Sequence, residues 1–150
     1  MQRFAATIDE CTELFAKEKL PQVEPQLLAL VAYSAHRPGH TVIARNMGLR
    51  AGRIAPVFGD LRAAIIAHRD HASVCLGLGD FAASETHASE SLRLAELTGN
   101  QSHVHLPLAY LGLSVALQGN TTQGAGIIRT ALKEHGVTRF TGILLVCSLS

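Results

Sequence analysis

The sequence predicts an all-α protein, a right-handed α-solenoid in which antiparallel helix hairpins stack one on the next. Three observations predict it. Glycine returns every twenty residues, apolar residues between the glycines recur at steps of three and four, and small residues coincide when the chain is superposed on itself at forty residues. One amphipathic helix cannot bury its apolar face alone, so the expected unit is a helix pair of about forty residues, with seven to eight helices in all.

The periodic glycines mark the expected helix ends. Glycine just past a helix tolerates the left-handed conformation that closes the last turn, and an Asp or Asn after it can accept hydrogen bonds from the first N–H groups of the next helix. Gly-Asp therefore predicts the end of one helix and the start of another. The glycines are Gly39, Gly59, Gly79, Gly99 and Gly119, and the residues that follow them are His40, Asp60, Asp80, Asn100 and Asn120.

The intervals between these glycines carry helical periodicity. In the third interval, between Gly79 and Gly99, Phe81, Ser84 and Ala88 share one face of the predicted helix. Pro107 falls in the first turn or so of its helix, where proline is tolerated. We expect one domain over residues 1–150, which comprises an N-terminal helix at 1–20, helix hairpins at 21–58, 60–98 and 103–136, and the start of a further helix at 139–150.

Small residues occupy the same place in successive forty-residue units. Side chains at the contact set the distance between two packed helices, so small residues there allow a close approach. We expect these positions to lie where the helices of a pair cross. They are Ala32, Ala72 and Gly112, then Ala44, Ser84 and Gly124, then Ala51, Ser91 and Ala131.

These positions carry a resemblance to tetratricopeptide repeats. Residues 72–96 resemble that family through Ala72, Gly79, Phe81, Ser84, Ser91 and Leu92, and residues 111–136 through Leu111, Gly112, Gly119, Gly124, Ala131 and Leu132. Pro56 stands where the family often ends its second helix. The resemblance covers roughly residues 24–136. The longer unit is similar to the helical-repeat regions of large bacterial transcription activators, in which phrases such as residues 95–100 are typical.

The resemblance implies a binding groove on the inner surface of the stack. Transferred position by position, the groove would be basic at one end and apolar at the other. An alternative is that further helices cover the apolar end. The implied groove residues are Tyr33, His36 and Arg37 in the first unit, Ile66, Arg69, Ser73 and Leu76 in the second, and Leu106, Ala109, Leu113 and Leu117 in the third.

Composition narrows the class of protein. The formal net charge of +1 argues against strong binding to nucleic acid through its phosphates. No apolar segment is long enough to span a bilayer, so we expect no membrane partner. Three cysteines without CxxC spacing, Cys11, Cys75 and Cys147, indicate reduced thiols in a cytoplasmic protein.

Eight histidines raise the hypothesis of a metal site. His68 and His71 share a helical face, and His103 and His105 precede the next helix, so four imidazoles could bind zinc if the hairpins brought them together. However, no Cys or carboxylate completes a recognised spacing, and His68 falls where the repeat places a core residue. We therefore expect packing and surface histidines, with no metal or other cofactor.

Catalytic patterns are equally weak. His87 with Glu90 could form an acid–base pair, but such neighbours on a helix surface are usually solvated. Cys75 lies in an apolar stripe and is expected to be a small core residue rather than a nucleophile. We expect no enzymatic activity.

The sequence therefore favours a non-catalytic scaffold that binds a protein or peptide, with a regulatory role. The alternative is an α-helical sensor domain that holds a small apolar ligand between repeats. Self-association is a further expectation, because the apolar side chains of the last segment, residues 139–150, lack a second helix to cover them.

Overall fold

The chain is described here from a computed structural model, which describes residues 41–135 and the single residues Ala6, Glu10, Glu13, Leu14, Lys17, Pro25, Gln26 and Leu28. Every regular element within residues 41–135 is helical, so the all-α prediction is confirmed for this part of the chain. The α-helices are α3 (Thr41–Ile54), α4 (Leu61–Gly77), α5 (Phe81–Leu97), α6 (His105–Leu117) and α7 (Thr121–His135), with 3₁₀ segments η1 (Pro56–Phe58) and η2 (Gln101–His103).

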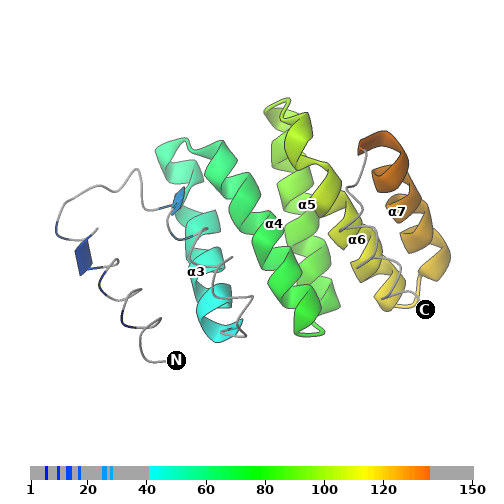
Figure 1. The fold of residues 1–150 in the computed structure, drawn as a ribbon, viewed down its shortest axis with the longest axis horizontal. Helices are drawn as coiled ribbons and strands as arrows, with labels where there is room; N and C mark the ends of the chain where they lie inside the picture. The colour runs from blue at the N-terminus through cyan, green and yellow to red at the C-terminus, as the bar shows by residue number, and fades with distance from the viewer. Residues whose placement is uncertain are drawn as a thin grey trace.

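The helices form a row in chain order, from α3 at one end to α7 at the other (Figure 1). Each helix packs against the next, and α4 also contacts α6. Helices α4 and α5 each contain 17 residues, which is the interval expected between successive Gly-Asp turns. No helix in the described part of the chain is both long and apolar enough to cross a membrane.

The turns between helices have the predicted backbone geometry. Gly59, Gly79, Gly99 and Gly119 all have positive φ, from +65° to +101°. At Gly79 the backbone N–H donates to the carbonyl of Leu76, and the N–H of Asp80 donates to the carbonyl of Cys75. These two bonds define a Schellman closure, which satisfies carbonyls at the helix end. The prediction is confirmed at these four glycines, and Gly39 lies outside the described residues.

The predicted caps form at the aspartates but not at Asn100. The Asp60 carboxylate accepts a hydrogen bond from the Ala63 N–H at 2.9 Å, and Asp80 accepts one from Ala83 at 3.2 Å. Asn100 makes no side-chain cap, and its side-chain oxygen Oδ1 instead accepts a hydrogen bond from the Ser102 hydroxyl. The cap prediction is wrong there because the chain enters the 3₁₀ segment η2 first, and α6 begins only at His105.

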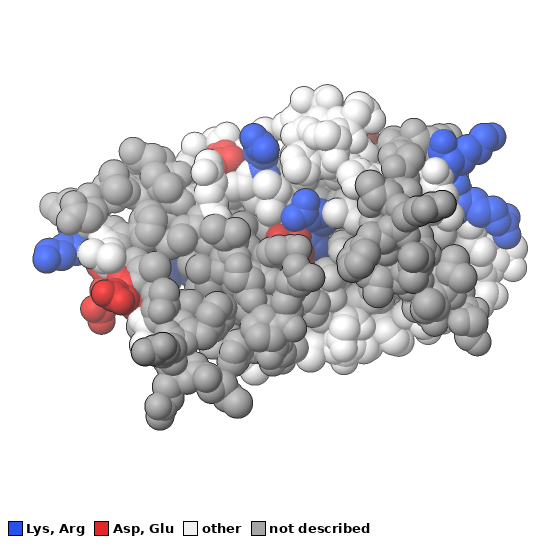
Figure 2. Space-filling model, in the orientation of Figure 1, with Lys and Arg blue, Asp and Glu red and all other residues white. Residues whose placement is uncertain are grey.

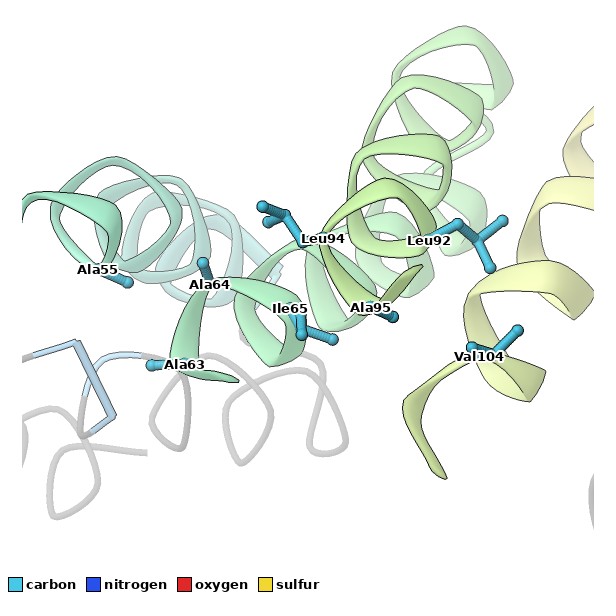
Figure 3. Close-up of a cluster of buried hydrophobic side chains, with 8 residues drawn as sticks. All are labelled: Ala55, Ala63, Ala64, Ile65, Leu92, Leu94, Ala95 and Val104. Carbon is cyan, nitrogen blue, oxygen red and sulfur yellow. The ribbon is translucent and has the colours of Figure 1, made fainter. Parts of the chain in front are cut away.

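A core cluster joins the middle of the row. Leu94 of α5 points to the side of Ala64, whereas Leu92 points to the opposite side, toward α6 and Val104 (Figure 3). Alanine dominates this cluster, so the helices approach one another closely. The buried members are Ala55, Ala63, Ala64, Ile65, Leu92, Leu94, Ala95 and Val104.

Serine hydroxyls bind α4 to α5 at two of the predicted contact positions. Ser84 donates to the backbone carbonyl of Ala72 at 2.9 Å, and Ser91 donates to that of Ile65 at 2.9 Å. Both serines are fully buried. A buried hydroxyl needs a partner, and here the neighbouring helix backbone supplies it.

The contact between α6 and α7 is closer still. A Cβ atom at Gly124 would lie 2.5 Å from the Gly112 carbonyl oxygen, and one at Gly112 would lie 2.7 Å from Ile128 Cγ1. Only glycine fits both places. The small residues at the other described positions that coincide in successive forty-residue units are fully buried as well, namely Ala44, Ala51, Ala72 and Ala131.

Candidate functional site

One face of α4 carries the central part of the implied groove. Ile66, Arg69, Ser73 and Leu76 follow one another at steps of three and four, so they share a face of the helix. All four are half-buried. Arg62 extends the stripe by one turn toward the start of α4 and is exposed. The sequence interpretation missed Arg62, although its distance of seven residues from Arg69 was a usable signal.

The stripe on α6 divides into covered and accessible positions. Leu106 is half-buried and Leu117 is 43% exposed, whereas Ala109 and Leu113 are buried. Ala109 and Leu113 form a core cluster with Ile128 of α7, and Leu76 of α4 packs against it. Ala109 and Leu113 are therefore part of the core in this structure. Their burial favours the alternative in which the apolar end of the groove is covered.

The basic end of the α4 stripe meets the start of α6. Arg69 is held by its neighbour, since its Nε and Nη2 both lie 2.7 Å from Asp70 Oδ1. Burial lowers the pKa of His103, and the charges of Arg69 and Arg62 lower it further. Two guanidinium groups and an imidazole thus lie close enough to influence one another. The sequence analysis placed His103 in a connection and did not associate it with Arg69.

Figure 2 shows one face of the molecule, on which Lys and Arg side chains occur in small separate groups and Asp and Glu side chains lie near several of them. The described part of this face has no continuous basic tract of the kind that tracks a phosphate backbone. The remaining implied groove residues, Tyr33, His36 and Arg37, lie outside the described residues.

A second group of polar residues lies where α4 meets α5, and we call it the histidine cluster: His68 and His71 of α4 with His87 of α5. His68 Nδ1 lies 3.0 Å from His87 Nδ1, and the two rings stack with centroids 5.2 Å apart. The His71 ring meets the edge of His87 with centroids 4.3 Å apart. The sequence predicted the shared face of His68 and His71, but not the third member.

Burial lowers the pKa of each imidazole in the cluster. For His71 the pKa falls to about 4. Burial is the largest cause, and the charges of His87, Arg45 and His68 lower the pKa further. For His68 and His87 burial is again the largest cause of a lowered pKa. All three side chains are therefore held neutral at pH 7.

The other candidate side chains occupy structural positions. Glu90 does not pair with His87, because both of its carboxylate oxygens accept hydrogen bonds from Arg93, at 2.8 and 2.7 Å. Cys75 is buried, and that burial raises the pKa of its thiol, as expected for a core residue. No group of three or more His, Cys, Asp or Glu side chains within the described residues has the arrangement of a metal site.

A hollow of about 470 Å³ lies between the first half of α3 and the end of α4. Its lining residues are Val42, Arg45, Asn46, Leu49 and Leu78. It does not involve Leu106, Leu113 or Leu117, which a closed ligand cavity between repeats would require. The hollow therefore adds nothing to the sensor hypothesis.

Comparison with protein families and with curated proteins does not assign the chain to a family. No protein-family model matches the chain, and no curated protein matches it.

Proposed function

We propose that the chain is a non-catalytic, regulatory scaffold of the tetratricopeptide-like kind, an α-solenoid that binds an acidic protein segment along α4 and α6. The observation that carries the proposal is the α4 stripe, in which Arg62 and Arg69 flank the half-buried Ile66, and the half-buried Leu76 follows near the end of the helix. Helix-lined grooves recognise peptides through apolar anchors, with charge setting the orientation.

The basic end supplies the charge recognition in this proposal. Arg62 is exposed, whereas Arg69 already pairs with Asp70 and its side chain is only 18% exposed. Arg62 therefore makes the first contact with an incoming carboxylate, and Arg69 contributes to the local positive potential. Leu76, Leu106 and Leu117 provide the apolar side of the groove.

Peptide binding with charge-reversal variants tests this function. Immobilised protein is probed with peptides that combine Asp or Glu with Leu or Phe, and with matched peptides that carry Lys in place of the acids. Wild-type protein is expected to retain the acidic set, and Arg62→Glu to weaken it by about tenfold or more, with a steep dependence on salt. Arg129→Glu, an exposed arginine of α7, is the matched control.

One outcome of this experiment would contradict the proposed binding surface. If both Arg62→Glu and Leu117→Asp bind acidic peptides as tightly as wild-type protein while their circular dichroism spectra are unchanged, the binding surface is elsewhere. Arg62 is preferred to Arg69 for this test, because Arg69→Glu would place a second carboxylate beside the buried Asp70.

A further inference from the structure

The histidine cluster is packed against two glycines of α3. A Cβ atom at Gly48 would lie 3.0 Å from His71 Nδ1, and one at Gly52 would lie 3.2 Å from His68 Nε2. The imidazoles of α4 thus approach the backbone of α3 at places where a side chain would crowd them. Helix α3 can rest in this position only while the rings keep their present size and orientation.

The contact between His68 and His87 accepts only one proton. Two ring nitrogens that face each other at 3.0 Å form a hydrogen bond when one donates and the other accepts. If both rings become protonated, both nitrogens carry hydrogen, and the contact turns from a bond into a repulsion between like charges. Full protonation of the cluster therefore requires these two rings to separate.

His71 adds a second conflict with protonation. The residue is buried, with a relative exposure of 2%, and Nδ1 has no hydrogen-bond partner among the described residues. The neutral ring can leave this nitrogen as an unused acceptor. The protonated ring would present a charged N–H toward Gly48 of α3, where none of the described residues accepts a hydrogen bond from it.

We propose that the histidine cluster, His68, His71 and His87, is a proton-sensitive latch that holds α3 against α4 while the rings are neutral and releases α3 when they are protonated. Release would admit water to His71 Nδ1 and allow His68 and His87 to move apart. The latch is independent of which segment, if any, binds along α4 and α6.

Charged groups around the cluster oppose one another. Arg45 of α3 and Arg93 of α5 disfavour protonation, whereas Asp80 at the start of α5 and Glu90 of α5 favour it. Glu90 is hydrogen-bonded to Arg93, and the charge of Arg93 partly offsets the effect of Glu90 on the pKa of His68. Burial and the contacts between the rings then decide the balance, which keeps the folded cluster neutral.

The sign of the pH effect follows from this balance. A histidine whose pKa is depressed in the folded state binds fewer protons when folded than when unfolded. Its contribution to stability is therefore complete above the unfolded pKa of about 6.5, and it is lost as the pH falls toward the folded pKa. For His71 alone, with a folded pKa of about 4, the folded-to-released ratio should fall on the order of twentyfold between pH 7 and pH 5.

Hydrogen exchange of the full chain tests where the effect is located. After correction for the intrinsic pH dependence of exchange, amides of α3 (Thr41–Ile54) should exchange about tenfold or more faster at pH 5 than at pH 7, while those of α6 and α7 change little. Equal protection of α3 at the two pH values would overturn the proposal. So would a parallel loss in α3 and α7, because the whole row would then open at once.

Two variants test whether the cluster is the cause. His71→Asn retains a polar group near the place of Nδ1 without titrating in this range, and His87→Phe retains a ring at a half-buried position. A folded His71→Asn variant should lose most of the pH dependence of α3 exchange. His87→Phe retains His71 and should lose only the part that comes from the contacts of His87, and it serves as the measurement if His71→Asn does not fold. His103→Gln, a partly buried histidine outside the cluster, should keep the wild-type dependence. The latch is refuted if His87→Phe keeps it too.

Discussion

A Cβ atom at Gly124 would lie 2.5 Å from the carbonyl oxygen of Gly112, whereas at Gly126, two residues along the same helix, it would meet no atom within 4 Å. A Cβ at Gly79 also has open space, but Gly79 has a φ of +78°. Together these three residues separate two properties of glycine. Gly124 provides close approach, Gly79 provides a left-handed backbone, and Gly126 provides neither.

Gly124→Ala should destabilise the protein by roughly 1–3 kcal/mol, the range for overpacking a tight contact. The added methyl meets backbone atoms of α6, which cannot rotate away. Gly126→Ala is the matched control and should be neutral or stabilising by up to about 1 kcal/mol, because alanine is the better helix former. Urea unfolding monitored by circular dichroism measures both. Equal midpoints for the two variants would contradict the close α6–α7 contact.

Gly79→Ala should cost about 1 kcal/mol even though the added methyl has room. The cost arises from the backbone alone, since an L-residue disfavours the positive φ of this turn. Thermal melting compared with Gly126→Ala isolates this conformational contribution. A melting temperature as high as that of Gly126→Ala would mean that the turn tolerates another backbone geometry.

At the scale of the helix, the caps differ in a way that stability measurements can resolve. Asp60→Ala should cost about 1 kcal/mol, because the carboxylate accepts a hydrogen bond from Ala63 N–H at the start of α4. Asn100→Ala should cost clearly less, since Asn100 makes no cap bond to the backbone. Chemical denaturation of the two single variants provides the comparison, and a larger loss for Asn100→Ala would contradict the observed capping.

The preferences of adjacent residues were sufficient to predict where several of the helices end and begin. The ends of α4 and α5 depend on Gly-Asp pairs, whose conformational preference is carried by two adjacent residues. The start of α6 was not predictable in this way, since Asn100 can cap a helix as well as Asp60 can. The 3₁₀ segment η2 instead follows from how Val104 joins the core of α4 and α5, which is a tertiary contact.

The histidine cluster shows the same division between local and tertiary information. His68 and His71 were predicted on one face because they are three residues apart. His87 joins them because residues equidistant from the turn of an antiparallel hairpin face each other, and His71 and His87 each lie eight residues from Gly79. That symmetry was present in the sequence. The nitrogen-to-nitrogen contact and the burial of His71 were not, because they depend on packing against α3.

At the scale of the whole molecule, the prediction for the C-terminal segment lies outside the described residues and stays a prediction from the sequence. The prediction is that the apolar side chains of Ile143, Leu144 and Leu145 promote self-association of the chain. Light scattering over a dilution series should detect species larger than a monomer, and Leu145→Lys should reduce them. A monodisperse monomer at high concentration, unchanged by that substitution, would show that the segment is covered within the chain.

The serine hydrogen bonds between α4 and α5 affect which amino-acid substitutions the chain tolerates. Ser84 and Ser91 donate to main-chain carbonyls of Ala72 and Ile65, and every amino acid carries such a carbonyl. The donor positions therefore demand a specific side chain, while the acceptor positions demand only a suitable volume. In a saturation scan, we expect position 91 to accept few residues and position 65 to accept Val, Leu or Met. This asymmetry would let one helix of the pair diverge while its partner remains constrained.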